Sequence, residues 1–324
     1  MRKVRVNSAL LWCATLYMWA AVAGATDGGP VQRLGVLSLQ GGFPLSTAWQ
    51  FRPGDDPGWA SPEYDHRAWQ QRSVPGRWPG GGFPQTGQMA WYRISLQLDL
   101  HDAGDRRDLP LLGIRTGQVM SAFELYAGGE LVGRVGKLPP QPEIQYDRAR
   151  VFAIPHRAID ADGRLVLAMR VWGGDQAMVD HWYGGPYRGE FQVGNYADLI
   201  RGMILGEVPG LIAVVLFLGF AVYHLYLYYR NRQLQLYLWF GLMAINIGVY
   251  SLALGQWKYL LGWSFISYQK LEYGSIHLLP AVAIQMLWVL LRQPVGPVLR
   301  AYQLSFVAIS LLVVFSPGLD IHYN

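Results

Sequence analysis

The carboxyl-terminal third of the chain is a succession of long apolar runs. Four of them contain no Asp, Glu, Lys or Arg, and they cover residues 208–229, 233–257, 273–291 and 301–319. A helix needs roughly 20 apolar residues to cross a hydrocarbon core about 30 Å thick. The pattern therefore predicts an α-helical transmembrane bundle within residues 202–319, followed by a short extracytoplasmic tail at 320–324.

The preceding region, residues 26–201, has a different period. Apolar and polar residues alternate at 92–100, 122–131, 149–154 and 165–172, as they do in half-buried β-strands. Turn sequences rich in Gly, Pro and Asp separate these stretches. Residues 165–172 alternate imperfectly and predict a central strand that is buried on both faces. We expect an antiparallel all-β sandwich.

The amino terminus has the layout of an export signal. Arg2, Lys3 and Arg5 precede an apolar run at 9–23, and small residues follow at 23–25. We expect residues 1–25 to be a cleaved signal peptide, with a retained anchor helix as the alternative. The one cysteine, Cys13, lies in this run, so the mature domain would fold without a disulfide.

Export of the amino-terminal domain fixes the expected orientation of the helices. The loop at 258–272 would lie outside, and the loop at 292–300, which carries two arginines, would lie inside. We therefore predict a multi-pass membrane protein with its β domain outside. Four crossings would end outside, which suggests a fragment of a protein with more spans.

Charge and motifs exclude several functions. The net charge of +5 comes from scattered basic residues without a basic stripe or a stacking platform, so nucleic-acid binding is not expected. The sequence has no phosphate-binding loop and no nucleophile elbow, and we expect that the chain is not an enzyme and holds no cofactor. Its seven histidines are too dispersed for a metal site. Asp55 and Asp56 are a weak calcium candidate, but acidic residues are also common in turns.

A few aromatic and basic residues are candidate ligand contacts. Aromatic faces stack on sugar rings, and arginine recognises carboxylates or phosphates through two parallel hydrogen bonds. Tryptophan equally fills sandwich cores, and Trp49, Trp69 and Trp172 are expected to do so. The predicted ligand contacts are Trp78, Trp91, Arg93, Arg115 and Trp182, with pairing to an acid of the same turn as the alternative for Arg93.

The exported region resembles the galactose-binding-like jelly roll. The resemblance rests on residues 49–60, 64–69, 74–78, 90–93, 123–133 and 165–172. Ala127-Gly128 stands where that fold usually has Asn-Gly. Such a domain followed by clustered spans is similar to the seven-transmembrane receptors with diverse intracellular signalling modules (7TMR-DISM). This resemblance implies a cytoplasmic histidine kinase, diguanylate cyclase or serine phosphatase, in cis or in trans, which the chain does not contain.

The sequence-based hypothesis is thus the sensing and membrane part of a bacterial signal-transduction receptor. The resemblance implies a multi-pass protein of the bacterial inner (plasma) membrane with its β domain in the periplasm. Its expected partners are a small-molecule or carbohydrate ligand outside, membrane lipid, the signalling module and a second copy in a homodimer. Gly184, Gly185 and Pro186 are the predicted mechanical link between domain and helices. The alternatives are a membrane-anchored carbohydrate-binding or carbohydrate-active envelope protein, and a transporter or assembly component.

Overall fold

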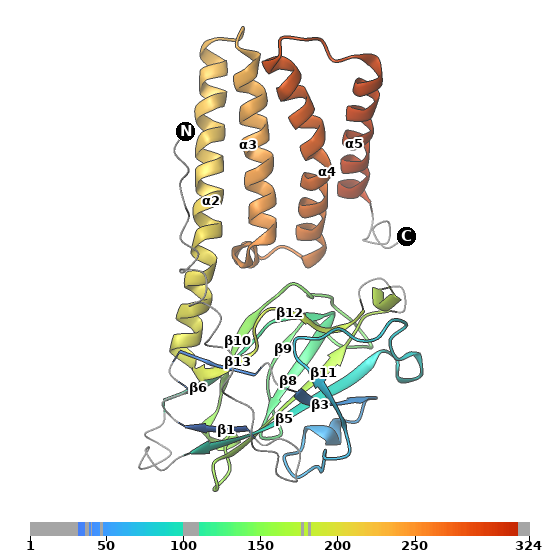
Figure 1. Cartoon of the computed structure of the whole chain (residues 1–324), viewed down its shortest axis with the longest axis vertical. Coiled ribbons are helices and arrows are strands. Elements are labelled where there is room, and N and C mark those ends of the chain that lie inside the picture. Colours follow the sequence, from blue (N-terminus) through green and yellow to red (C-terminus); the bar gives the residue numbers. More distant parts are fainter. Residues whose placement is uncertain are drawn as a thin grey trace, which may run out of the picture. The chain divides into compact units, whose positions relative to one another are not determined.

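The described part of the chain contains two larger sheets, a two-stranded sheet and four long helices (Figure 1). The computed structural model describes residues 32–35, 39, 41–45, 48–99, 110–175, 178–180 and 183–316. The predicted signal peptide, Cys13 and the tail at 320–324 lie outside the described residues.

The larger sheet has seven strands in the order β4-β3-β5-β11-β8-β9, with β1 beside β5. Only the β1–β5 pairing is parallel among the pairings of the described strands. The strands are β1 (Gln32–Gly35), β3 (Ala48–Pro53), β4 (Gln70–Ser73), β5 (Met89–Asp99), β8 (Ala122–Ala127), β9 (Glu130–Val135) and β11 (Arg164–Trp172). β11 is central and almost wholly buried, as predicted from its near-continuous apolar sequence.

A four-stranded sheet lies against the larger one. Its order is β10-β6-β13-β2, and a separate pair joins β12 to β7. The strands are β2 (Phe43–Pro44), β6 (Leu112–Thr116), β7 (Gln118–Met120), β10 (Arg150–Ile154), β12 (Gly185–Arg188) and β13 (Gln192–Asn195). Ile114 and Val193 of this sheet share one buried core with Leu167 and Phe123 of the larger sheet. The expected sheet-rich, largely antiparallel domain is therefore present.

One predicted strand is a hairpin instead. Residues 122–131 contain β8, a turn at Gly128 and Gly129, and the start of β9. Both glycines have positive φ, +55° and +85°. A Cβ at Gly128 would lie 2.6 Å from the carbonyl oxygen of Ala158, so the turn needs glycine for space as well as for conformation. Apolar alternation continues across such a tight turn, and periodicity alone does not show the reversal.

The four predicted membrane helices are confirmed as long apolar helices. They are α2 (Tyr196–Arg230), α3 (Gln235–Leu254), α4 (Phe265–Leu290) and α5 (Pro297–Phe315), and all four are long and apolar enough to cross a membrane. Each packs against the next in sequence. Large apolar side chains such as Val222 and Phe315, 71% and 78% exposed, point outward as lipid-facing residues do.

Helix α2 starts well before the apolar run that predicted it. Its 35 residues give a length of about 52 Å at ~1.5 Å per residue, which exceeds the hydrocarbon core. The first turns carry Asp198, Arg201 and Glu207, which hydropathy assigns to no span. Asn195 caps this polar extension by accepting hydrogen bonds from the backbone N–H groups of residues 197 and 198.

Helix α4 is held between its neighbours by side chains that donate to its backbone. Asn246 of α3 donates to the carbonyl of Ser275 at 3.0 Å, and Ser310 of α5 donates to that of Gly274 at 2.8 Å. Gln303 donates to the carbonyl of Ala281 at 3.0 Å. These bonds flank Pro280, which lacks a backbone N–H. Such interhelical hydrogen bonds are a common means of joining helices inside a membrane.

Candidate functional site at the contact between the β domain and the helices

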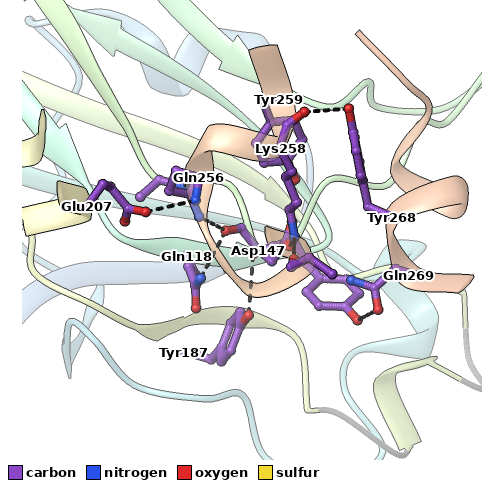
Figure 2. Close-up of polar contacts among 12 residues, drawn as sticks. Gln118, Asp147, Tyr187, Glu207, Gln256, Lys258, Tyr259, Tyr268 and Gln269 are labelled. Atoms are coloured by element: carbon purple, nitrogen blue, oxygen red, sulfur yellow. Dashed lines mark hydrogen bonds and ion pairs between the residues drawn. The ribbon is translucent and has the colours of Figure 1, made fainter. Parts of the chain in front are cut away.

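Two short segments far apart in sequence meet in a polar cluster, which we call the Asp147 contact. One is the loop before β10, and the other is the 3-10 helix η7 (Gln256–Leu261), which follows α3. The members are Tyr146, Asp147, Glu207, Gln256, Lys258, Tyr259, Tyr268 and Gln269, most of them labelled in Figure 2. The cluster joins the β domain to α2, η7 and α4.

A buried ion pair forms its centre. The Lys258 side chain is 0% exposed, and its Nζ donates to Oδ2 of Asp147. The same Nζ donates at 2.5 Å to the carbonyl of Ala253 in the last turn of α3. The Tyr259 hydroxyl donates to the other carboxylate oxygen of Asp147. Both oxygens of Asp147 are therefore used, which is the condition for a buried charge to be tolerated.

Gln256 connects three segments through its side chain and backbone. Its Nε2 donates to the carbonyl of Asp147 at 2.9 Å, and its Oε1 accepts from the N–H of Ala149 at 3.2 Å. Its own backbone N–H donates to Oε2 of Glu207, on the polar extension of α2, at 2.9 Å. Trp257 adds a bond from Nε1 to the Glu207 carbonyl at 3.1 Å. The loop before β10 is thereby hydrogen-bonded to η7, and η7 is hydrogen-bonded to α2.

Aromatic residues extend the contact to the start of α4. Tyr146 packs edge-on against Phe265 with ring centroids 4.9 Å apart, and its hydroxyl donates to Oε1 of Gln269 at 3.0 Å. The Tyr268 hydroxyl donates to the carbonyl of Lys258 at 2.5 Å. Arg148 lies over the Tyr259 ring, 4.5 Å from its centroid. Such ring contacts give the contact a fixed geometry in addition to its charge.

The electrostatics keep Tyr259 protonated. Burial raises the pKa of the Tyr259 hydroxyl above its usual range, and the Asp147 carboxylate raises it further. Burial, and then Asp147, also raises the pKa of Tyr187. At neutral pH Tyr259 is thus a hydrogen-bond donor to Asp147.

A second connection between domain and helices is covalent. Strand β13 of the four-stranded sheet runs directly into α2, with Asn195 as the last strand residue and the helix cap. Helix α2 also contacts β6 and β10. Sheet and helix therefore follow each other at this junction without an intervening loop.

The predicted mechanical link lies elsewhere. Gly185 and Pro186 belong to β12, which pairs with β7. A Cβ at Gly184 would lie 2.4 Å from the ring of Trp78, and one at Gly185 would lie 2.6 Å from it. The segment is therefore packed inside the β domain, and its role in signalling stays a prediction.

Three predicted ligand contacts are buried. Trp78 is 2% exposed and its Nε1 donates to the Tyr92 hydroxyl at 2.8 Å. Trp91 is 0% exposed and stacks on Tyr126 with centroids 5.5 Å apart. Arg93, also 0% exposed, donates to the carbonyls of Trp59 and Ser61. These side chains have packing roles here, and ligand contact by them stays a prediction.

The other predicted site residues do not gather at one place. Arg115 of β6 is partly exposed and lies 3.6 Å from Glu190. Trp182 lies outside the described residues. Among the predicted positions that the structure describes, Trp78 lies beside Gly184 and Gly185, and that group is part of the packed interior. The alternative prediction for Arg93 is an ion pair with an acid of the same turn. The hydrogen-bond partners of Arg93 are instead carbonyl oxygens and Nδ1 of His66.

Asp55 and Asp56 have structural partners. Asp55 accepts two hydrogen bonds from Arg170, both 2.6 Å. Asp56 caps the 3-10 helix η3 (Pro57–Ala60) by accepting from the N–H of Gly58 at 2.8 Å. Among the described residues, no group of His, Cys, Asp and Glu has the arrangement of a metal site. The turn interpretation accounts for Asp56, whereas Asp55 forms an ion pair with Arg170 of β11.

Sequence reasoning does not find the Asp147 contact. The pattern indicates Lys258 only as a charge in an outside loop, and Asp147 lies in a polar stretch without a motif. The one available signal is a lysine immediately after an apolar span and next to Trp257 and Tyr259. Nothing local distinguishes such a lysine from a lipid-interface residue, because its partner lies 111 residues away.

Comparison with family models finds no match, and comparison with curated proteins finds none either. Among solved structures, a β-glucuronidase of Bacteroides uniformis bound to cyclophellitol-6-carboxylate aziridine is similar to 47% of this chain over 17% of its own, with 18% identity and a TM-score of 0.37. A glycosyl hydrolase family 2 member of Bacteroides cellulosilyticus is similar to 47% of this chain over 20% of its own, with 19% identity and a TM-score of 0.36. A β-glycosidase of Bacteroides vulgatus is similar to 47% of this chain over 20% of its own, with 18% identity and a TM-score of 0.34. The chain therefore spans a fifth or less of the length of these enzymes.

Proposed function

We propose that this protein is the sensing and membrane part of a signal-transduction receptor of the 7TMR-DISM kind, whose β domain binds a small-molecule or carbohydrate ligand. The observation that carries the proposal is the fully buried Lys258 of a helix connection paired with Asp147 of the β domain. A change in the β domain that moves Asp147 away would expose the Lys258 charge to solvent or leave it buried without its partner. The helices then respond to events in the domain.

In this proposal the chain has two arrangements that differ in free energy. A buried ion pair adds little net stability, but removing one partner is costly, so the pair selects one geometry over others. A ligand shifts the balance only by its differential affinity for the two arrangements. The hydrogen bonds from η7 to Glu207 and from Tyr268 to Lys258 extend that choice to α2 and α4.

The output of this receptor would be a cytoplasmic module in cis or in trans. In this proposal the β domain lies in the periplasm, and α2 to α4 carry the change to the opposite side of the bacterial inner membrane. The chain would act without catalysis of its own, through the packing of its helices.

The test uses the full chain in lipid nanodiscs. A panel of sugars and small carboxylates is screened for ligands that raise the unfolding temperature. Spin labels are then placed at Glu63→Cys in the β domain and Leu260→Cys in η7, in a Cys13→Ser background. We expect a ligand to change the distance distribution between the labels, and Lys258→Met to abolish this change while the ligand still binds.

Lys137→Met is the matched control, because it removes a lysine from an exposed ion pair with Glu143 in the β domain. It should leave the ligand-induced distance change intact. A ligand that binds without changing the distance would contradict the receptor proposal and favour a carbohydrate-binding envelope protein. Turnover of glycosides by the full chain would instead favour a carbohydrate-active one.

A further inference from the structure

A cavity of about 540 Å³ lies between α3, α4 and α5. Its walls are mainly apolar, with Trp239 and Leu242 from α3, Leu278 and Val282 from α4, and Leu304 and Val307 from α5. Sites for small molecules typically have volumes of about 300–1,000 Å³, apolar walls and a few polar groups. The cavity has the size and the lining of a binding site.

Polar groups gather where the cavity approaches the α4–α5 connection. Nη1 of Arg300 donates to Oε1 of Gln285 at 3.2 Å, and Nε2 of Gln303 lies 3.4 Å from the same oxygen. Gln303 is 5% exposed, and its Oε1 is buried without a hydrogen-bond partner in the part of the chain that the structure describes. A buried acceptor without a donor is unfavourable, so this position favours a bound group that supplies one.

The charges around the cavity have one sign. Lys270 and Arg300 are among the described residues that line it, and none of these residues is acidic. Lys270 donates to the carbonyl of Ser316, and Arg300 donates to the neutral amide of Gln285. Arginine recognises phosphate through its fork of N–H donors. Lys270 is in the second turn of α4 and Gln285 is near the end of that helix, so Lys270 and Arg300 lie at opposite ends of the cavity. The end beside Arg300, where Gln285 and Gln303 also lie, is the one suited to an anionic group.

The membrane-spanning character of the surrounding helices indicates which anion can reach the cavity. All three are long and apolar enough to cross a membrane, so lipid is the solvent of their outer faces. A compound that pairs an anion with a long apolar chain matches an apolar cavity with a cationic end. Basic pockets between membrane helices bind anionic headgroups in this way.

We infer that the cavity binds an anionic phospholipid of the leaflet in which the α4–α5 connection lies. The phosphate contacts Arg300, a headgroup hydroxyl donates to Oε1 of Gln303, and an acyl chain lies along Leu278 and Val307. This inference is independent of the receptor proposal, because it concerns only α3, α4 and α5.

The test is native mass spectrometry of the full chain released from nanodiscs that contain equal amounts of phosphatidylglycerol and phosphatidylcholine with identical acyl chains. We expect phosphatidylglycerol to be retained at least about tenfold more than phosphatidylcholine, a ratio that corresponds to one favourable charged contact. Arg300→Gln should remove this preference. Val307→Trp, which fills the apolar part of the cavity, should lower retention of both lipids.

Arg230→Gln is the control, since Arg230 ends α2 and does not line the cavity. It should leave the preference unchanged, and circular dichroism should show the same helix content for every variant. Equal retention of the two lipids by the wild-type chain would overturn the inference. So would an equal loss in Arg230→Gln and Arg300→Gln, which would indicate surface charge only. Crosslinking of Leu304→Cys to a protein helix in native membranes would also overturn it, because a helix would then occupy the cavity.

Discussion

Lys258 and Asp147 show how a single pair can depend on its surroundings. The lysine is fully enclosed, whereas the Asp147 side chain is 14% exposed. Two tyrosines, Tyr259 and Tyr268, have their rings 5.5 and 5.8 Å from the lysine Nζ and replace part of its lost hydration. An isolated charge at this place would be unfavourable, and the pair is tolerated because Nζ of Lys258 also donates to the Ala253 carbonyl and Asp147 also accepts from Tyr259.

Asp147→Leu is expected to destabilise the protein by about 3–5 kcal/mol, because it leaves the Lys258 charge buried and unpaired. The double variant Asp147→Leu, Lys258→Met should recover most of that loss, since neither charge then remains. Thermal unfolding in nanodiscs measures both. Lys137→Met is the control, and its exposed pair should contribute about 0–1 kcal/mol. Equal unfolding temperatures of the single and double variants would contradict the role assigned to the pair.

We expect His66 to give the stability of the β domain a pH dependence. Burial, followed by the charge of Arg93, lowers its pKa below the usual 6.5. Its Nδ1 accepts from Nε of Arg93 at 3.3 Å, which requires the neutral ring. Since the unfolded chain holds the proton more tightly, the stabilisation is present above pH ~6.5 and is lost as the pH falls through the folded-state pKa.

We therefore expect His66→Asn to reduce the loss of stability between about pH 6.5 and pH 5, where the wild-type ring becomes protonated on unfolding. Unfolding temperatures of both proteins across this range measure the difference. His156→Asn is the control, because His156 lies at the start of another 3-10 helix of the same domain, η6 (His156–Ala158). An unchanged slope in His66→Asn would show that another group is responsible.

Strand β12 and the turn before it illustrate packing between elements. Trp78 fills the space above Gly184 and Gly185, and its indole is fixed by the hydrogen bond to Tyr92. Gly184 has a φ of +34° and Gly185 a φ of +81°. Both space and backbone conformation therefore require glycine at this corner.

Gly184→Ala should destabilise the β domain by about 1–3 kcal/mol, because the added methyl group meets the Trp78 ring. Gly81→Ala is the matched control, since Gly81 also has a positive φ, +79°, but a methyl group added there would meet no atom within 4 Å. Chemical unfolding should separate the clash from the backbone strain that both variants share. If both variants lose the same stability, the contact with Trp78 is unimportant. Alanine at this position consequently tests packing rather than signal transmission.

The connectivity of the helices and the Asp147 contact both place η7 on the same side of the helices as the β domain. If each helix crosses the membrane once, the α2–α3 and α4–α5 connections lie on one face of the membrane and the α3–α4 connection lies on the other. The η7 segment then returns to the side of the β domain, where its hydrogen bonds to Asp147 place it independently. The predicted outside position of the loop at 258–272 fits this geometry.

Labelling with a membrane-impermeant maleimide should distinguish the two faces in a Cys13→Ser background. In spheroplasts we expect Glu63→Cys of the β domain and Leu260→Cys of η7 to be labelled without lysis, whereas Gln233→Cys, between α2 and α3, is labelled only after lysis. Leu260 is 77% exposed, so its accessibility depends on the side rather than on burial. Equal labelling of Leu260→Cys and Gln233→Cys would contradict the alternating arrangement.

The sequence alone determined the elements whose signals are local. Long uncharged runs predicted four helices, and alternation with Gly- and Pro-rich turns predicted a sheet-rich domain, because burial against lipid or a core repeats at a fixed spacing along the chain. Only the tertiary structure decided which polar residues meet. Asp147 and Lys258 are 111 residues apart. Arg93 donates to a carbonyl of a turn that is distant in sequence, and the ring of Trp78 packs against Gly184. Such pairs leave no periodic signal, since their energy arises only when the folded chain removes both partners from water.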